Sequence, residues 1–258
     1  ARERPLLPSV AFNDHTSMTM RAYDVPVQER AFELSPDFSI ASLDDDRMKQ
    51  RTLSKAQRAG LSQEDYIAML GKVWDRRSEV PNKISEVARM ASAVEAPMLS
   101  HDDTRADTRG YFRNLGASVA EFPMVMEAVE AARNHEDLII LGAPNAARGG
   151  SHIGSVGAAD LIEAGLCDAL ASDYFYPAML AAIDRLDREK RADRVTLWSL
   201  LSSGPARAMR LNDRGRITIG SRADLVLVDW TNGQAPVIEG TWIAGRAAYR
   251  VRTQQHLN

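Results

Sequence analysis

The sequence has little of three things that would place it in a specialised class of protein. Cys167 is its only cysteine, so no disulfide bond can form within the chain. Its 32 Lys and Arg stand against 35 Asp and Glu, which gives no electrostatic reason to expect nucleic acid or an anionic membrane as a partner. No apolar run approaches the roughly 18 residues of a membrane-spanning helix. Disulfide bonds are rare in the reducing cytoplasm, and this chain cannot form one within itself. We therefore expect a cytoplasmic protein.

What the sequence does contain is typical of a globular protein. It has 258 residues, of which 45% are hydrophobic and 26% are charged. This length allows one large α/β domain or two ordinary domains around a sizeable core. Residue 1 is Ala rather than Met, and a strand-like segment follows almost at once. We therefore expect the chain to lack its true beginning.

Apolar segments alternate with helical patterns along most of the chain. Short apolar runs bounded by polar or turn residues predict buried strands over residues 7–14, 96–101, 117–123, 137–145 and 167–174. Helical spacing of apolar residues predicts helices from residue 62 onward, where Pro81 splits the pattern, and over residues 108–116, 124–133, 158–165 and 177–191. Strands that alternate with helices predict parallel βα units, so a doubly wound sheet and a (β/α)₈ barrel both fit.

Two parts of the chain depart from this alternation. Residues 17–51 have little periodicity and predict a long loop or insertion; its run Asp44 to Asp46 favours a solvated loop over a metal site. After residue 195, "TLWSLLSS" predicts a helix that stops at Gly204 and Pro205, and "PARAMRL" predicts another. Residues 215–230 and 235–251 then alternate and turn as antiparallel strands do.

Polar groups recur where the predicted parallel strands end. In parallel α/β proteins the carboxyl ends of the strands form the functional cleft. The groups found there are Asn13, Asp14 and His15, then His101, Asp102 and Asp103, then "GAPNAARGGSH", then Asp173. Imidazoles and carboxylates from separate strands commonly bind Zn²⁺, Mn²⁺ or Fe²⁺ and leave a position open for water. A single strand-end histidine is more often a hydrogen-bonded structural residue, but the recurrence over several strands favours ligands.

The loop "APNAARGGSHIGS" offers a different chemistry. Gly149 and Gly150 let the backbone approach a ligand, while Arg148, Ser151 and His152 provide donors for phosphate oxygens. The segment matches neither the P-loop nor the dinucleotide fingerprint. An ordinary βα loop is an equally favoured alternative for it.

Several of these segments resemble a known family. "GRITIGSRADLVLVDW" resembles the C-terminal signature of the amidohydrolase superfamily of metal-dependent hydrolases. More narrowly, "FNDHT", "LSHDDT", "VAEFP", "LGAPNAARGGSHIGSV" and "LASDYFYP", in that order, are similar to the PhnM family of phosphonate metabolism. The resemblance implies an α/β fold, a TIM-like (β/α)₈ barrel with a small β-sandwich. It also implies hydrolysis of α-D-ribose 1-methylphosphonate 5-triphosphate to the 5-phosphate and pyrophosphate in the carbon–phosphorus lyase pathway.

The same resemblance implies roles for individual residues. It implies a divalent metal, Zn, Mn or Fe, bound by His15, His101 and Asp173. Asp173 would also serve as the base that takes a proton from metal-bound water. The residues implied to bind the substrate are Asn145, Arg148, Ser151 and His152. Asp102 and Asp103 would orient His101 or its neighbours. The partners expected are a small phosphorylated sugar phosphonate and a second copy of the protein in a homodimer.

The sequence departs from the family pattern in two places. After "DHT" the family often continues with Pro-Gly-Gln, whereas this sequence continues with Ser17, Met18 and Thr19. This difference puts the contacts of that loop in question. The first-strand metal ligands of the superfamily, and its bridging residue on a middle strand, have no counterpart. We therefore expect an incomplete barrel over residues 1–210, with the insertion at 17–51, and the C-terminal part of a small β domain over residues 211–258. Such a chain would be part of a longer protein and inactive as given.

Two other functions fit the same sequence. One is another amidohydrolase that acts on a cyclic amide or an amino-heterocycle, as dihydroorotases and deaminases do. The other is a non-catalytic interaction subunit that completes a barrel with a partner, since unpaired strand edges must be covered. The Arg148 loop favours a polyphosphate over a neutral ring.

Overall fold

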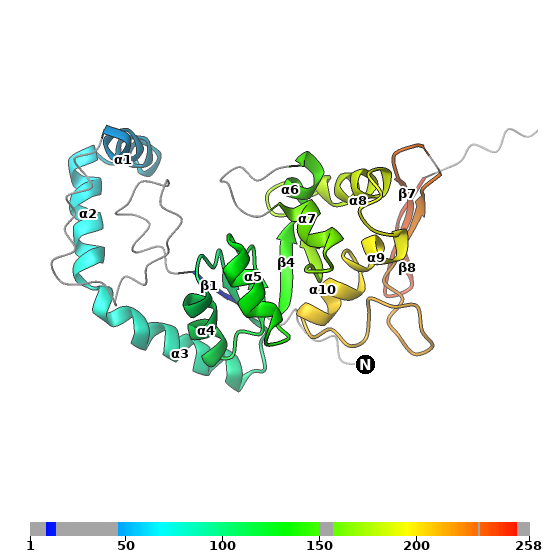
Figure 1. Ribbon diagram of the computed structural model, residues 1–258, viewed down its shortest axis with the longest axis horizontal. Helices are drawn as coiled ribbons and strands as arrows, with labels where there is room; N and C mark the ends of the chain where they lie inside the picture. The colour runs from blue at the N-terminus through cyan, green and yellow to red at the C-terminus, as the bar shows by residue number, and fades with distance from the viewer. Residues whose placement is uncertain (1–8, 14–45, 150–156, 232, 252–258) are drawn as a thin grey trace, which may run out of the picture. The chain divides into compact units, whose positions relative to one another are not determined.

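The computed structural model describes residues 9–13, 46–149, 157–231 and 233–251. The chain divides into two compact units, residues 1–134 and residues 135–258. Each unit contains parallel strands and the helices that follow them (Figure 1). No helix in the described part of the chain is long and apolar enough to cross a bilayer.

The strands of the first unit are parallel and lie within three of the predicted segments. They are β1 (Val10–Phe12), β2 (Met98–His101) and β3 (Val119–Glu121). β2 pairs with both neighbours, with Phe12 opposite Ser100 and His101 opposite Glu121. Their polar carboxyl ends therefore lie at the same level.

The helices of the first unit are α1 (Asp46–Ala59), α2 (Gln63–Asp75), the short 3₁₀ helix η3 (Arg77–Glu79), α3 (Val80–Ala93), α4 (Ala106–Asn114) and α5 (Met126–Arg133). The predicted start at residue 62 is confirmed, since the Ser62 hydroxyl accepts a hydrogen bond from the Asp65 N–H at 3.0 Å. Pro81 lies in the first turn of α3, where its missing N–H leaves no helical bond unmade. The pattern is therefore split there, as predicted.

The loop was predicted to extend to residue 51. This boundary is wrong, because helix α1 begins at Asp46. Thr52 and Ala56 of α1 are buried and lie one helical turn apart, so this helix has one sheltered side. The many charged residues of α1 hid this pattern from the sequence analysis. Residues 14–45, which include Asp44, Asp45 and His15, lie outside the described part of the chain.

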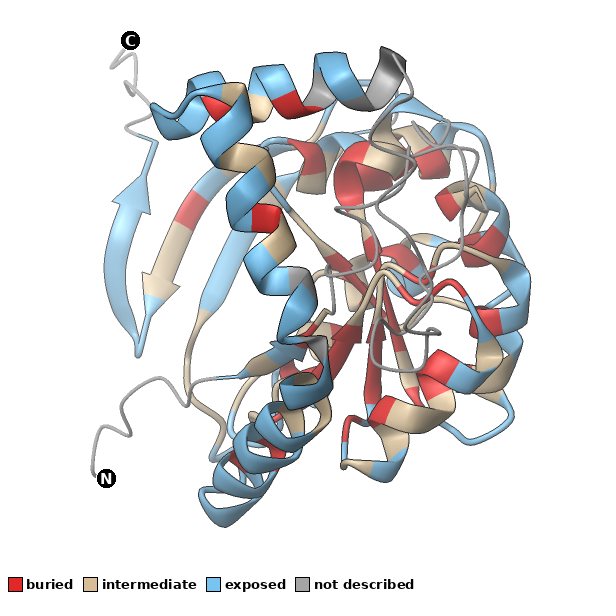
Figure 2. Cartoon of the chain, turned by 90° about the vertical axis from the view of Figure 1, so that its left-hand side faces the viewer, coloured by how far each residue is buried: buried red, intermediate tan, exposed pale blue. Residues whose placement is uncertain are grey.

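An apolar cluster joins α3 and α4 to the strands of the first unit. It contains the buried residues Phe12, Ala88, Ala91, Ala96, Met98, Phe112 and Ala117. The rings of Phe12 and Phe112 stack with centroids 5.6 Å apart. The alanines of α3 let that helix pack closely on β1. Figure 2 shows buried residues in the parallel strands and on one side of the helices beside them.

The described residues of the second unit form two parallel strands and five helices before the C-terminal sheet. β4 (Leu138–Gly142) pairs with β5 (Ala169–Ala171). The helices are α6 (Ala143–Arg148), α7 (Ala158–Glu163), α8 (Ala178–Arg188), α9 (Arg194–Ser199) and α10 (Ser203–Ala208). Ile139, Ile183, Leu186 and Leu197 are fully buried between them. The predicted strand over 137–145 ends early, because Pro144 suits the first turn of α6 better than a strand.

Gly204 and Pro205 lie inside α10 rather than between two helices, which corrects the boundary expected from the sequence. A Cβ atom built on Gly204 would lie 1.9 Å from the Asp168 carbonyl oxygen, so only glycine fits there. We predict that Gly204→Ala lowers the free energy of unfolding by about 1–3 kcal/mol, measured by urea titration.

The control for Gly204 is Gly71→Ala in α2, where an added Cβ meets no atom within 4 Å. This change should leave stability unaltered or raise it by about 0.5–1 kcal/mol, because alanine favours a helix. Equal effects of the two substitutions would show that the Asp168 contact is not what requires glycine.

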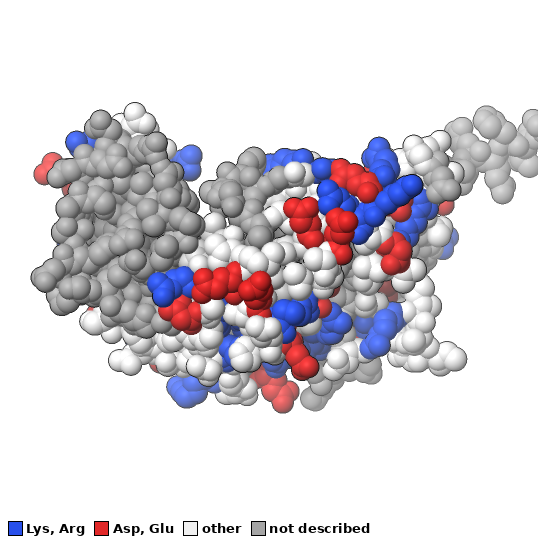
Figure 3. Space-filling view, viewed as in Figure 1, with Lys and Arg blue, Asp and Glu red and all other residues white. Residues whose placement is uncertain are grey.

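Charged side chains on and beside α8 pair with one another. Arg191 contacts Glu163 of α7 at 2.5 Å, and Arg194 contacts Asp187 at 2.8 Å. The Arg194 guanidinium also lies 4.6 Å from the ring centroid of Trp230. Basic and acidic groups are interspersed around this part of the second unit on the face shown in Figure 3. Such exposed pairs add little stability, but they leave neither sign of charge in excess on α8.

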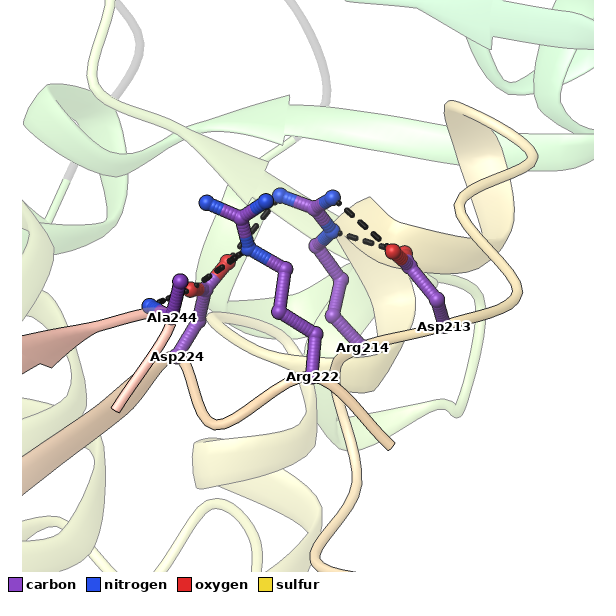
Figure 4. A network of polar contacts seen from close by, with 5 residues as sticks. All are labelled: Asp213, Arg214, Arg222, Asp224 and Ala244. Carbon is purple, nitrogen blue, oxygen red and sulfur yellow. Dashed lines mark hydrogen bonds and ion pairs between the residues drawn. The ribbon is translucent and has the colours of Figure 1, made fainter. Parts of the chain in front are cut away.

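The described part of the chain ends in an antiparallel sheet, which lies within residues 211–258. Its strands are β6 (Leu225–Asp229), β7 (Val237–Ile243) and β8 (Arg246–Arg250). A polar network holds the segment before β6 against the turn between β7 and β8 (Figure 4). Asp224 is its centre, with Arg214 at 3.0 Å, Arg222 at 2.8 Å and the Ala244 N–H at 2.8 Å.

This network predicts a pH dependence of stability. Burial raises the pKa of Asp224, but the hydrogen bonds from Ala244 and Arg222 outweigh it and hold the pKa below its ordinary value of 3.8. A lowered folded-state pKa contributes stability that is present above the unfolded value and is lost as the pH falls through the folded value. Asp224→Asn should therefore lower the urea midpoint more at pH 7 than at pH 3. Glu239→Gln, on β7, should show no such difference.

Candidate functional site

The chain turns sharply where β2 ends in the first unit. His101 is the last residue of β2, and Asp102 has a left-handed backbone with φ +59°. The Asp102 N–H donates to the Glu121 carbonyl at 3.0 Å, which ties the ends of β2 and β3 together. The side chains of His101 and Asp102 are both partly exposed at this edge.

Two side chains approach the Nδ1 atom of His101. The Asp102 carboxylate lies 3.0 Å from Nδ1, and the Asn13 amide nitrogen lies 3.1 Å from it. Asn13 also donates to the Asp102 carboxylate at 3.3 Å. Nδ1 can donate a hydrogen bond to Asp102 when it carries a proton, or accept one from the Asn13 amide when it does not, but it cannot do both at once. When Nδ1 carries the proton, Nε2 carries the lone pair that binds metals.

The end of β3 faces the other nitrogen of the same ring. The Glu121 carboxylate lies 3.9 Å from His101 Nε2. The ring of Phe122 contacts His101 edge to face, with centroids 5.2 Å apart. The sequence analysis assigned neither Glu121 nor Phe122 to a site. A partial signal was present, since Glu121 lies near the end of the strand predicted over residues 117–123.

Asp103 points into the core and contacts Arg109 of α4, and both side chains are 0% exposed. The Asp103 carboxylate accepts from the Ser100 hydroxyl and lies 3.7 Å from the Arg109 guanidinium. Arg109 also donates to Ser100 and to the carbonyls of Ala117 and Val119. Burial raises the pKa of Asp103 above its ordinary value, against the hydrogen bond from Ser100 and the charge of Arg109. This cluster joins α4, β2 and β3.

The second unit contains the residues expected to bind substrate. Asn145 and Arg148 lie in α6, directly after β4, and the exposed Arg148 donates to the Asn145 amide oxygen at 3.4 Å. Gly149 ends α6 with φ +84°, and a Cβ there would lie 2.0 Å from a guanidinium nitrogen of Arg185. Ser151 and His152 lie outside the described residues.

Asp173 lies two residues after β5 in the second unit and is exposed. Its backbone is left-handed, with φ +51°. The aromatic side chains that follow it, Tyr174, Phe175 and Tyr176, are exposed as well. The carboxylate is therefore accessible at the carboxyl end of its strand, as a metal ligand or base must be.

Left-handed backbones recur where the parallel strands end. Asp102, Phe122 and Asp173 each follow a strand and have positive φ without being glycine. Such a conformation costs about 1–2 kcal/mol, and residues that adopt it cluster at functional sites as well as in turns. The sequence gives no sign of it for Phe122, because aromatic residues rarely adopt this conformation.

The donor types at these strand ends suit a divalent metal. Neutral imidazole and carboxylate are the usual protein ligands of Zn²⁺ and Mn²⁺. Within residues 9–13, 46–149, 157–231 and 233–251, no group of three or more His, Cys, Asp or Glu is close enough to hold an ion. The expected ligand His15 lies outside those ranges. His101 and Asp173 belong to different units.

Known proteins resemble this chain in sequence. Residues 75–249 match the model of the amidohydrolase family. The α-D-ribose 1-methylphosphonate 5-triphosphate diphosphatase of Escherichia coli K12 is 36% identical over 190 residues, which are 72% of this chain and 48% of that protein. The chain thus spans about half the length of this curated relative.

Two solved structures resemble it in fold. An amidohydrolase from Thermotoga maritima MSB8 is 22% identical, with a TM-score of 0.50 over 60% of this chain and 44% of its own. A prolidase complexed with N-methylphosphonate-L-proline is 15% identical, with a TM-score of 0.50 over 65% of this chain and 48% of its own. Both likenesses bear on the fold alone and confirm the predicted α/β class with part of a barrel. The family match over residues 75–249, which is more than half of the chain, establishes that the chain belongs to the amidohydrolase family.

Proposed function

We propose that the gene product containing this chain hydrolyses α-D-ribose 1-methylphosphonate 5-triphosphate to the 5-phosphate and pyrophosphate, with a divalent metal. The observation that supports this substrate most strongly is the 36% identity to the Escherichia coli diphosphatase. The polar strand ends of the family fold support hydrolysis. The reaction breaks one phosphoanhydride bond and uses one water.

In this proposal, His15, His101 and Asp173 hold the metal at the carboxyl ends of their strands. When bound, the ion would lower the pKa of a water toward neutrality and so supply the nucleophile. Asp173 accepts the proton from that water, since its carboxylate is exposed at the end of β5. Asp102 orients the His101 ring through the contact at Nδ1, 3.0 Å away. Asp103 acts on the same strand end through Ser100.

Asn145, Arg148, Ser151 and His152 bind the phosphates of the substrate in this proposal. Arg148→Ala should raise KM for the triphosphate about 10- to 100-fold with a smaller change in kcat, because a charge-assisted hydrogen bond to phosphate is lost. Arg105→Ala, which removes an exposed arginine from the first unit, is the control. An unchanged KM in Arg148→Ala would favour a neutral ring as the substrate.

A panel of substrates separates this function from the other amidohydrolase activities. The sugar phosphonate triphosphate, a cyclic amide and an amino-heterocycle would each be offered to the metal-loaded gene product. We expect kcat/KM to be highest for the triphosphate, with pyrophosphate among the products. Turnover of the cyclic amide or the heterocycle, without pyrophosphate release, would overturn the proposal.

We further propose that the protein acts in the cytoplasm as a homodimer without a separate partner subunit. Light scattering after size-exclusion chromatography of the gene product should give twice the monomer mass. Recovery only in association with a different protein would instead favour a non-catalytic interaction subunit.

A further inference from the structure

The last turn of α6 carries two of the residues that we assign to the substrate, Asn145 and Arg148. Gly149 ends this turn with a left-handed backbone, φ +84°, and its N–H donates to the Asn145 carbonyl at 3.0 Å. Helix α8 packs beside α6 within the second unit (Figure 1). The position of Arg148 therefore depends on how this turn is held against its neighbour.

Arg185 of α8 binds this turn from outside α6. Its Nη1 atom donates to the Ala146 carbonyl at 3.3 Å. Ala146 carries one of the last four carbonyls of the helix, which lack partners within the helix itself. A cation at this end also complements the helix dipole. Arg185 is held in turn by Glu189, one turn further along the chain, to whose carboxylate Nε donates at 2.6 Å.

The guanidinium of Arg185 also fills the space beside Gly149. A Cβ atom built on Gly149 would lie 2.0 Å from Nη1, 2.1 Å from Nη2 and 2.3 Å from Cζ of Arg185. Any side chain at this position would therefore displace the guanidinium. The sequence predicts that this glycine lets a ligand approach the backbone. In the structure, the group that approaches it is Arg185.

From these contacts we propose that Arg185 is a positioning residue for the phosphate-binding turn. It fixes the last turn of α6 on α8 and so sets the place from which Arg148 meets the substrate phosphates. Two of its three nitrogens already bond to Ala146 and Glu189, so it acts through Arg148 rather than on the substrate. The inference rests on the proposed function, because it requires Arg148 to bind phosphate.

Two other roles make different predictions for variants of Arg185. In the first, its guanidinium contacts the phosphates directly. In the second, it only links α6 to α8 and affects stability alone. A double-mutant cycle with Arg148 separates all three roles, because only a residue that acts through Arg148 loses its effect when Arg148 is absent.

The probe is inorganic tripolyphosphate, whose Kd for the gene product is measured by isothermal titration calorimetry. The variants are Arg185→Met, Arg148→Ala and the double variant. Methionine keeps an unbranched apolar stem but lacks the donors of arginine. Arg89→Met, which changes an exposed arginine of α3, is the control. Urea titration measures the stability of each variant.

We expect Arg185→Met to raise the Kd for tripolyphosphate about 5- to 10-fold, the size of effect that one lost hydrogen bond produces. Arg148→Ala should raise it about 10- to 100-fold, because the binding group itself is removed. Adding Arg185→Met to Arg148→Ala should change the Kd by less than about 2-fold, since no binding group remains to be positioned. Arg89→Met should match the wild type.

Gly149→Ala tests the same contact from the other side. The added Cβ would push the guanidinium of Arg185 away, so the Kd should rise about as much as in Arg185→Met. Gly165→Ala is the matched control. Gly165 also has a left-handed backbone, φ +71°, but a Cβ built on it meets no atom within 4 Å. This variant carries the same backbone strain and should leave the Kd unchanged.

Equal effects of Arg185→Met in the wild-type and Arg148→Ala backgrounds would overturn the inference and show that Arg185 contacts phosphate directly. An unchanged Kd in Arg185→Met would overturn it in favour of a structural link. So would a wild type that binds no tripolyphosphate. The first two results leave the proposed function standing if the wild type releases pyrophosphate from its substrate. The expected cycle without pyrophosphate release would instead overturn the function and leave the positioning role.

Discussion

Asp173→Asn is expected to lower kcat for pyrophosphate release by about 100- to 10,000-fold, the range over which general bases contribute. The carboxylate of Asp173 is exposed after β5, where it can accept a proton from a bound water. An amide of the same shape cannot accept that proton. Asparagine also tolerates the left-handed backbone at this position, φ +51°, so the fold should be unaffected. Steady-state kinetics on the metal-loaded gene product would measure the change.

The matched control is Asp75→Asn, which alters an exposed aspartate at the end of α2. It should leave both kcat and KM unchanged. If Asp173→Asn raised KM and left kcat unaltered, Asp173 would bind the substrate rather than accept the proton, and the base would have to be sought elsewhere.

Arg109→Met should lower the free energy of unfolding by about 3–5 kcal/mol, because it leaves a buried carboxylate without its countercharge. Arg109 and Asp103 are both 0% exposed and lie 3.7 Å apart. Arg109 also donates to the carbonyls of Ala117 and Val119, which would lose these partners. Urea titration at neutral pH would measure the loss.

The loss should shrink in acid. Burial already raises the pKa of Asp103 above its ordinary value of 3.8. A raised folded-state pKa gives stability that is present below the unfolded value and is lost as the pH rises through the folded value. Without Arg109 the pKa of Asp103 should rise further. Protonation of Asp103 at low pH then removes most of its buried negative charge. The difference between Arg109→Met and the wild type should therefore be largest at neutral pH.

Arg105→Met is the control, since Arg105 is exposed and forms an exposed ion pair with Asp107 at 2.8 Å. Exposed pairs of this kind contribute about 0–1 kcal/mol, so stability should change little. If Arg109→Met also lowered the free energy of unfolding by less than about 1 kcal/mol, the buried cluster would not stabilise the strand ends.

The sequence predicted the order of the elements well because buried strands and amphipathic helices differ in apolar period. β2 and β3 lie inside their predicted segments, and the helix start at Ser62 follows from its spacing to Asp65. The misplaced boundaries have local causes. α6 begins at Ala143, with Pro144 in its first turn, where a strand was expected to continue, and α1 extends into the predicted loop as far as Asp46.

The candidate site was harder to predict, because its contacts depend on register and burial. That His101 and Asp102 lie together follows from their adjacency in sequence. The approach of Glu121 to His101 depends on the pairing of β2 with β3, which no local pattern specifies. The burial of Arg109 was equally hidden, since arginine in an amphipathic helix is usually exposed.

The most direct test of the central claim is pyrophosphate release by the purified gene product, measured with the triphosphate substrate before and after removal of metal by a chelator. We predict stoichiometric release of pyrophosphate and the 5-phosphate, loss of activity on chelation, and recovery when Zn²⁺ or Mn²⁺ is restored. His101→Ala should show neither bound metal nor release. Release that continues unchanged without metal, or no release from a fully metal-loaded protein, would contradict the claim.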